Sequence, residues 1–277
     1  MTGFWKKAAA FAGLFPVCFL LSMRPGRGRE DRMQPFRGYI AHRGLHDLKA
    51  GCPENSMPAF RRAADAGFGI ELDVRLTGDG VPVVVHDEDL FRAAGVRRRI
   101  ADLTLAGLRQ YRLFGTEEKV PLLKEVLEAV DGRVPLIIEL KADIRCRDLC
   151  EKAAALLDRY RGIYCIESFS PAALRWFRRH RSEVLRGQLS TDQWKEGNRQ
   201  WWYADPFLKW CTGNFLTRPD FVAYNLRFMD TPPVFTLSRL WRAEMAVWTV
   251  RSPEEVRKYR KCCSIFIFEG FLPDGRP

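Results

Sequence analysis

Charged and imidazole side chains occur at the ends of four apolar segments that have the composition of buried β-strands. They are His42, Arg43, Glu71, Asp73, His86, Glu139 and Lys141. Glu71 and Asp73 alternate with apolar residues, so a strand would carry both carboxylates on one face. Two buried carboxylates repel each other unless a cation joins them, and oxygen ligands suit Mg²⁺ or Ca²⁺. The pattern therefore predicts a site for one divalent cation.

Each of these signals has an ordinary structural explanation when it is taken alone. A single histidine is more often structural than catalytic, and Glu139 with Lys141 could form a plain salt bridge. All of the polar exceptions nevertheless fall at the same end of otherwise apolar strands, which is where α/β-barrel enzymes carry their catalytic groups. Their common position favours one functional site over scattered structural pairs.

The order of segments predicts the fold that would bring these residues together. From residue 38 onward, short apolar runs alternate with helical patterns, which implies a parallel sheet covered by helices. The predicted strands are 38–42, 69–77, 81–86, 134–141, 163–168, 184–190, 221–224, 245–250 and 264–268, and the predicted helices are 57–66, 122–130, 149–160, 172–180 and 254–261. We expect the α/β class, a TIM-type (β/α)8 barrel over residues 38–277 with a hairpin-like extension around residues 78–80. A doubly wound sheet would more naturally carry a glycine-rich loop after its first strand.

The composition agrees with one domain of this kind. The chain has 277 residues, close to the roughly 250 of a typical barrel, and a formal net charge of +11. A basic surface favours anionic partners such as phosphorylated substrates, lipid headgroups or nucleic acid, although it also serves solubility. The sequence contains no nucleic-acid-binding module, so we expect a small-molecule substrate and no nucleic acid.

The first 37 residues differ from the rest of the chain. An uncharged run over residues 8–23 follows two lysines and precedes a polar stretch rich in Arg, Gly and Pro. We interpret residues 4–23 as a membrane anchor and residues 24–37 as a polar linker, which predicts a membrane-associated protein. One alternative is a cleaved signal peptide followed by secretion. The other is an N-terminal helix that is buried against the domain and does not contact a membrane. Basic residues flank both sides, so the orientation of the anchor stays open.

Residues 193–217 interrupt the alternation of strands and helices. The segment is rich in aromatic residues, namely Trp194, Trp201, Trp202, Tyr203, Phe207 and Trp210. It could form a hydrophobic minicore under the barrel, or a flap that lines the site or lies at a bilayer interface.

The motifs that carry the polar residues also resemble a known family. They are His42-Arg43-Gly44, Pro53-Glu54-Asn55-Ser56, Glu71-Leu72-Asp73-Val74, Val85-His86-Asp87 and Glu139-Leu140-Lys141. In order and spacing they closely resemble the glycerophosphodiester phosphodiesterase family, from about residue 38 to the C-terminus. The resemblance implies a TIM-type barrel that uses a divalent cation to hydrolyse glycerophosphodiesters to sn-glycerol 3-phosphate and an alcohol.

The resemblance also implies a role for each motif residue. His42 and His86 would be the general acid and base, and Glu71, Asp73 and Glu139 would hold the metal. Arg43 would bind the phosphate and Lys141 would neutralise charge beside it. Glu54 would support the site or contact the metal. These roles agree with the chemistry, because phosphodiester hydrolysis needs charge neutralisation, a base for the attacking group and an acid for the leaving alkoxide.

Several alternatives stay open at this stage. The last strand ends in Phe268-Glu269, where the family often has Thr-Asp, and together with the tryptophan-rich segment this leaves the released alcohol undetermined. Hydrolysis of lysophospholipids, as by a lysophospholipase D, and a catalytically silent barrel that binds lipid headgroups are the competing functions. The oligomeric state, the choice between Mg²⁺ and Ca²⁺, and the division of acid and base roles are likewise open.

Overall fold

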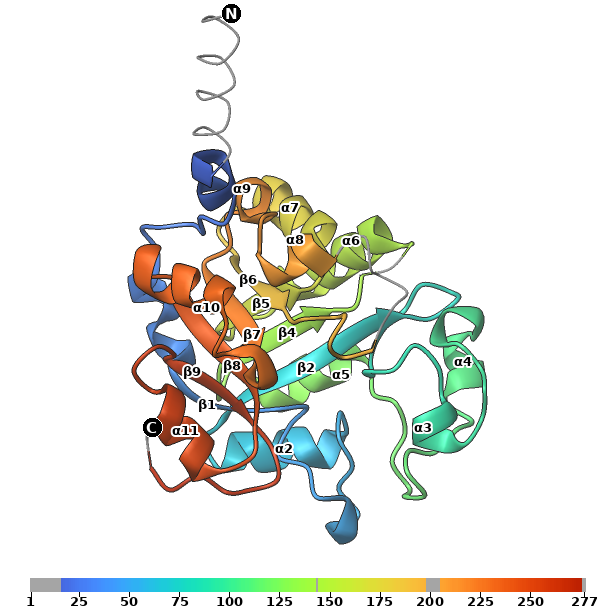
Figure 1. Cartoon of the computed structure of the whole chain (residues 1–277). Coiled ribbons are helices and arrows are strands. Elements are labelled where there is room, and N and C mark those ends of the chain that lie inside the picture. Colours follow the sequence, from blue (N-terminus) through green and yellow to red (C-terminus); the bar gives the residue numbers. More distant parts are fainter. Residues whose placement is uncertain (1–15, 143, 198–204, 276–277) are drawn as a thin grey trace, which may run out of the picture.

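Eight parallel strands close into a barrel surrounded by helices (Figure 1). The computed structural model describes residues 16–142, 144–197 and 205–275. The barrel strands are β1 (Gly38–Ala41), β2 (Gly69–Leu76), β4 (Leu136–Leu140), β5 (Tyr164–Ser168), β6 (Leu185–Ser190), β7 (Phe221–Asn225), β8 (Glu244–Val250) and β9 (Ile265–Phe268). Strand β1 pairs with both β9 and β2, which closes the barrel and confirms the predicted TIM-type fold.

One short strand lies outside the barrel. Strand β3 (Pro82–Val84) runs antiparallel to β2, and Val74 pairs with Val84. This pair is the hairpin-like extension that the glycines around residue 79 predict. Beyond it, residues between Val83 and Val120 form a small apolar cluster of their own. The loop that carries His86 therefore rests on a second, local core.

Helices follow most of the strands. The α-helices are α2 (Met57–Asp65), α3 (Phe91–Ala94), α4 (Leu105–Leu108), α5 (Leu123–Val130), α6 (Cys146–Leu157), α7 (Pro171–His180), α8 (Asp205–Lys209), α9 (Asn214–Thr217), α10 (Pro232–Phe235) and α11 (Pro253–Tyr259). Shorter 3₁₀ and π segments are η1 (Glu30–Phe36), η2 (Leu48–Ala50), η3 (Ile100–Asp102), η5 (Leu226–Phe228) and η6 (Thr236–Leu240). Helix α2 begins where expected, because the Ser56 side chain accepts a hydrogen bond from the Ala59 N–H.

Alternation along the strands separates two apolar layers. Ile70, Leu72 and Val74 of β2 face the covering helices, whereas Glu71 and Asp73 point to the barrel interior. In the interior, Ile137 of β4 and its apolar neighbours fill the lower part of the barrel. The charged residues of the predicted site lie above this layer, toward the carboxyl ends of the strands, as the spacing predicts.

The segment expected to be a polar linker packs against the barrel. Met33 and Phe36 of η1 are fully buried in the interior cluster, and the Gly26 N–H donates to the Pro219 carbonyl at 2.7 Å. Arg29 forms an ion pair with Asp220 at 3.2 Å. Two apolar residues in an otherwise polar run account for the difference, since burying them closes the lower end of the barrel.

The N-terminal helix and the tryptophan-rich insertion lie together. Residues 16–22 are helical, and the Phe19 ring meets the Trp210 ring edge-on at 5.2 Å. The Asn214 side chain donates a hydrogen bond of 2.8 Å to the Met23 carbonyl. Residues 4–15 of the predicted anchor and residues 198–204 of the insertion lie outside the described residues. Within the described part of the chain, no helix combines the length and apolar character needed to cross a membrane.

Candidate active site

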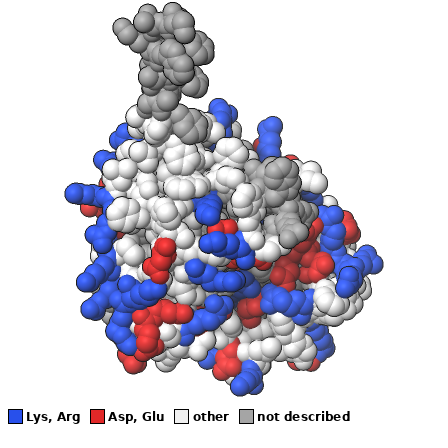
Figure 2. All heavy atoms as spheres, viewed as in Figure 1, with Lys and Arg blue, Asp and Glu red and all other residues white. Residues whose placement is uncertain are grey.

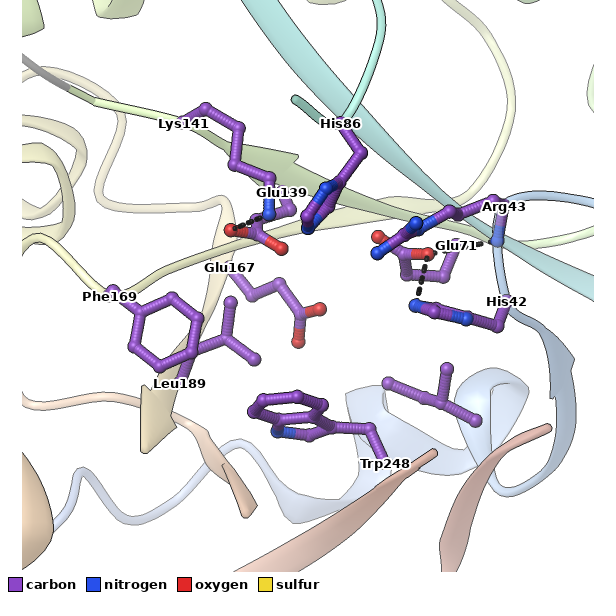
Figure 3. Close-up of a pocket in the computed structure, with 11 residues that line it drawn as sticks. His42, Arg43, Glu71, His86, Glu139, Lys141, Glu167, Phe169, Leu189 and Trp248 are labelled. Carbon is purple, nitrogen blue, oxygen red and sulfur yellow. Dashed lines mark hydrogen bonds and ion pairs between the residues drawn. The ribbon is translucent and has the colours of Figure 1, made fainter. Parts of the chain in front are cut away.

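A pocket opens at the carboxyl ends of the barrel strands (Figure 3). Its volume is about 380 Å³, including the open mouth. It is lined by His42, Arg43, Glu71, His86, Glu139, Lys141, Glu167, Phe169, Leu189, Trp248 and Ile267. Six of the seven polar residues singled out in the sequence line the pocket, and the seventh, Asp73, lies beside it through its ion pair with Lys141.

Three buried carboxylates meet in this pocket. Glu71 and Asp73 come from β2 and Glu139 from β4, where Asp73 and Glu139 are paired in register. Ligand oxygens of the three residues lie within 4.8 Å of one another. Burial and the negative charge of Asp73 raise the pKa of Glu71 well above its usual value. An all-oxygen set of this kind suits a hard divalent cation, so the residues fit the metal that their types predict.

Lys141 connects two of these carboxylates. Its ammonium group lies 2.9 Å from Asp73 Oδ1 and 2.7 Å from Glu139 Oε1. Burial works against the charged amine, but the two carboxylates outweigh this effect and raise the pKa of Lys141. Lys141 therefore carries a positive charge at the edge of the carboxylate cluster.

His42 is held by a carboxylate from the far end of the chain. Its Nδ1 lies 2.5 Å from Oε2 of Glu269, and Arg251 donates to the other oxygen of Glu269 at 2.5 Å. Its Nε2 faces the cluster, 3.9 Å from Glu71 Oε2. Burial lowers the pKa of His42, an effect that the Glu269 hydrogen bond opposes. We call His42, Glu269 and Arg251 the His42 arm.

His86 is held in the same manner by its sequence neighbour. Its Nδ1 lies 2.7 Å from Asp87 Oδ1, and Arg92 Nε donates to Asp87 Oδ2 at 2.6 Å. Burial lowers the pKa of His86, and the charge of Lys141 adds to the effect. We call His86, Asp87 and Arg92 the His86 arm. In each arm a carboxylate at Nδ1 leaves Nε2 to face the pocket.

Arg43 lies between the two arms. Its φ of 55° is left-handed, and its Nη1 lies 2.6 Å from Glu54 Oε1 while its Nε lies 3.3 Å from Asp73 Oδ2. The next residue, Gly44, has a φ of 81°, and a Cβ there would lie 2.8 Å from the Ala59 backbone. The sharp turn of the His-Arg-Gly motif thus directs the guanidinium into the pocket.

Glu54 supports this guanidinium from behind. Besides Arg43, it accepts hydrogen bonds of 2.8 and 2.7 Å from Arg92. Both oxygens are therefore occupied by guanidinium groups, and Glu54 does not belong to the three-carboxylate cluster. This geometry favours the supporting role over direct contact with a metal.

Comparison with known proteins identifies the family. The profile of the glycerophosphoryl diester phosphodiesterase family matches residues 42–264. The chain belongs to this family. The match begins at His42, directly after β1, and ends at Ser264, directly before β9, so it includes six of the eight barrel strands.

Relatives and solved structures agree with this assignment. A human lysophospholipase D is 33% identical over 166 residues, which cover 55% of this chain and 51% of the relative. A glycerophosphodiester phosphodiesterase of Caldanaerobacter subterraneus is 42% identical over 113 residues, which cover 38% of this chain and 45% of the relative. The matched part thus spans about half the length of these relatives. An Oleispira antarctica phosphodiesterase, solved with its product sn-glycerol 3-phosphate, shares the fold, with a TM-score of 0.69, 21% identity and coverage of 86% of this chain and 94% of that chain.

The sequence patterns did not predict several of the side chains that lie in or beside the pocket. Glu167 ends β5 as Glu139 ends β4, so the same signal of a charged residue at a strand end would have found it. Glu269 stood out only as a departure from the family pattern. The pocket wall contains Phe169 and Trp248, whose rings meet edge-on at 5.8 Å, and no local pattern distinguishes them from core aromatics.

His46 also approaches the site. Its Nε2 lies 3.8 Å from Glu269 Oε2, so it lies behind the His42 arm. Glu269 thus has three basic neighbours: His42, His46 and Arg251. Burial would raise the pKa of Glu269, but these neighbours lower it well below its usual value.

Proposed function

We propose that this protein is a divalent-cation-dependent phosphodiesterase that hydrolyses glycerophosphodiesters to sn-glycerol 3-phosphate and an alcohol. The observation that carries the proposal is the meeting of two carboxylate-held imidazoles with three clustered carboxylates in one pocket. A headgroup-binding protein without activity would need neither imidazole. Membership of the family and the product bound by the Oleispira antarctica enzyme support the same substrate class.

Three carboxylates would hold the cation. Glu71, Asp73 and Glu139 would be its ligands, and a divalent cation held there would supply positive charge for the nonbridging phosphate oxygens. Arg43 binds a phosphate oxygen through its guanidinium, which suits tetrahedral oxyanions. Lys141 adds a second fixed positive charge beside the same group.

The two imidazoles would divide the proton transfers. One takes a proton from the attacking hydroxyl as the new O–P bond forms, and the other gives a proton to the alkoxide as the old P–O bond breaks. Burial lowers the pKa of His42 and of His86, which favours the neutral form that the base needs. The carboxylates at Nδ1, Glu269 and Asp87, act in the opposite direction and favour the protonated form that the acid needs. The attacking hydroxyl belongs to water, or to the adjacent glycerol carbon with a cyclic phosphate as the first product.

Turnover of defined substrates tests this function. Glycerophosphocholine, glycerophosphoethanolamine and glycerophosphoglycerol should release sn-glycerol 3-phosphate, and EDTA should stop the release. Restoring Mg²⁺ or Ca²⁺ in parallel titrations then identifies the natural ion. Absence of turnover with every substrate and both ions would refute the proposal.

Lysophospholipase D activity is the second candidate function. Its support is the similarity to the human enzyme of that name together with an apolar surface beside the barrel. A lysophospholipid in the same assay distinguishes the two, because a lysophospholipase D releases the headgroup alcohol and leaves a lysophosphatidic acid. Faster turnover of glycerophosphocholine than of lysophosphatidylcholine favours the first function.

We also infer that the protein associates with membranes through residues 4–23 and through the surface that adjoins residues 16–23. The exposed apolar residues of this surface are Val17, Leu21, Phe207, Phe215 and Leu216. Arg178 donates to the Leu216 carbonyl at 2.5 Å, and the Arg24 guanidinium lies 5.8 Å from the centre of the Trp241 ring. Figure 2 presents this part of the molecule as largely uncharged, with Lys and Arg along its sides. Apolar side chains beside arginines suit an anionic lipid surface. The side of the membrane on which the barrel lies is open, and secretion after cleavage is the competing localisation.

Vesicle flotation tests the membrane proposal. The full chain should float with phosphatidylcholine–phosphatidylserine vesicles more strongly than with phosphatidylcholine alone. Phe215→Ser should weaken flotation, whereas Phe91→Ser on α3, an equally exposed residue far from this surface in Figure 1, should leave it unchanged. Equal loss in both variants, or no flotation of the unchanged protein, would contradict the proposal.

A further inference from the structure

One buried carboxylate of the pocket receives no hydrogen bond from the residues that the structure describes. Glu167 at the end of β5 is 1% exposed, and among the described residues nothing donates a hydrogen bond to its Oε2. It pairs in register with Glu139, yet it does not belong to the cluster of three carboxylates whose oxygens lie within 4.8 Å. In Figure 3 its carboxyl group reaches into the middle of the pocket, between Glu139 and Trp248.

The other pocket carboxylates are all satisfied from within the protein. Glu71 accepts from the Arg43 N–H at 3.0 Å, and Glu139 contacts Lys141 at 2.7 Å. A buried carboxyl oxygen without a donor destabilises the fold, because it loses its water and gains nothing in return. A group kept in this state inside a binding pocket is best explained by a donor that the ligand brings.

The surroundings of Glu167 narrow the chemistry of that donor. On one side lie the three clustered carboxylates, Arg43 and Lys141, which would bind the phosphate in the proposed function. On the other side lies an apolar wall of Phe169, Leu189, Trp248 and Ile267. A matching ligand has a phosphate ester, hydroxyl groups on the second and third carbons from the ester oxygen, and a short carbon chain that can lie against the wall. A glycerol phosphate unit has this order of groups.

We propose that Glu167 is a specificity residue that accepts a hydrogen bond from a free hydroxyl of the substrate's glycerol unit. The released alcohol then extends toward the open mouth, because Glu167 occupies the enclosed part of the pocket. This inference rests on the proposed function for its substrate class. It assigns to Glu167 neither a metal-ligating nor a proton-transfer role.

Ligand binding tests the assignment without relying on turnover. Calorimetry in the presence of Mg²⁺ or Ca²⁺ compares sn-glycerol 3-phosphate with propyl phosphate, which has the same carbon chain without hydroxyls. The unchanged protein should bind the glycerol ligand about 3- to 10-fold more tightly, the range expected for one additional hydrogen bond. Glu167→Ala should bind both ligands alike, and Glu167→Gln should retain part of the preference. Glu128→Gln on the exposed side of α5 is the matched control and should retain all of it.

The outcomes separate this inference from its alternatives. If Glu167→Ala still prefers sn-glycerol 3-phosphate to propyl phosphate, the inference is wrong. If Glu167→Ala changes the affinity for Mg²⁺ or Ca²⁺, Glu167 is a metal ligand and the inference is also wrong. If Glu167→Ala reduced turnover only for substrates that carry a choline group, Glu167 would bind the headgroup and the inference would be wrong. The melting temperature should stay the same or rise in Glu167→Gln, since no internal hydrogen bond is lost; a clear fall would indicate a structural role and refute the proposal. If the hydroxyl preference appears without turnover of any diester, the proposed function fails and the assignment of Glu167 stands.

Discussion

The His42 arm and the His86 arm have the same plan but are built from different parts of the chain. In each, a carboxylate accepts from Nδ1 and an arginine binds the other carboxylate oxygen. In the His86 arm all three residues lie within seven positions. In the His42 arm, Glu269 comes from 227 residues farther along the sequence.

The difference lies in what each arm depends on. The His42 arm exists because β1 pairs with β9, where the His42 N–H donates to the Phe268 carbonyl at 2.9 Å. The His86 arm rests on the local cluster around Val85 and Leu90 and connects through Arg92 to Glu54. One imidazole is thus positioned by barrel closure and the other by a loop with its own core. Changes in each arm should therefore have separable consequences.

Removal of the cation should have the largest effect, because both arms act on the phosphate group that the cation would hold. EDTA, or Glu71→Gln in the carboxylate cluster, should reduce kcat/KM by at least about 10³-fold, since metal stabilisation is worth several kcal/mol. The measurement is release of sn-glycerol 3-phosphate before and after addition of Mg²⁺ or Ca²⁺. Activity that survives exhaustive chelation would exclude a cation-dependent mechanism.

Loss of either imidazole should have the next largest effect. We expect His42→Ala and His86→Ala each to lose about 10²- to 10⁴-fold in kcat, the usual range for a general acid or base. A glycerophosphodiester of p-nitrophenol sharpens the comparison, because this leaving group departs without a proton. One variant should regain most of its rate with that substrate, which marks its histidine as the acid. Unchanged rates in either alanine variant would remove that histidine from the mechanism.

Loss of the supporting carboxylates should have a smaller effect. Glu269→Gln and Asp87→Asn each weaken a charge-assisted hydrogen bond to Nδ1, and we expect about 10- to 100-fold losses in kcat. Each loss should come with a shift of the pH–rate profile, whereas Glu254→Gln on exposed α11 should change neither quantity. The two variants should differ in melting temperature. Glu269→Gln should lower it, because the Glu269 side chain connects the end of the last strand to the end of the first. A loss of stability confined to Asp87→Asn would contradict this account of the arms.

The smallest expected effect is on the free energy of unfolding at low pH, through Glu54, which binds Arg92 of the His86 arm. Burial alone would raise the pKa of Glu54, but hydrogen bonds from Arg92 and the charge of Arg43 lower it to about 2, against a usual 4.5. Between these values the unfolded chain binds the proton that the folded state excludes. The stabilisation is therefore complete above pH 4.5 and is lost as the pH falls toward 2. Its size is on the order of 1–3 kcal/mol.

Unfolding in urea over a pH series measures this contribution. Glu54→Gln should lower the free energy of unfolding at pH 7 and flatten its dependence on pH below 4.5. Glu128→Gln is the control and should retain the slope of the unchanged protein. An equal slope in Glu54→Gln would mean that Glu54 does not supply it.

Local patterns were sufficient to predict much of this site. Alternation along β2 placed Glu71 and Asp73 on one face, and the strand–helix order predicted a barrel whose carboxyl ends gather His42, His86, Glu139 and Lys141. These inferences succeed because a strand turns its side chains with a period of two, whatever surrounds it. The family resemblance rests on the same short segments.

The contacts between side chains from distant parts of the sequence could not be predicted, because they depend on the closed barrel. The contact of Glu269 with His42 and the burial of Met33 and Phe36 join positions that are far apart in the sequence. A period of two predicts which face a residue takes, but it does not predict which strand meets it across the barrel or which side chain fills the end. The sequence determined the chemical groups and the strand ends that carry them. The tertiary structure decided which carboxylate holds His42 and which one, Glu167, has no hydrogen-bond donor in the described part of the chain. Both depend on how eight strands meet around one interior.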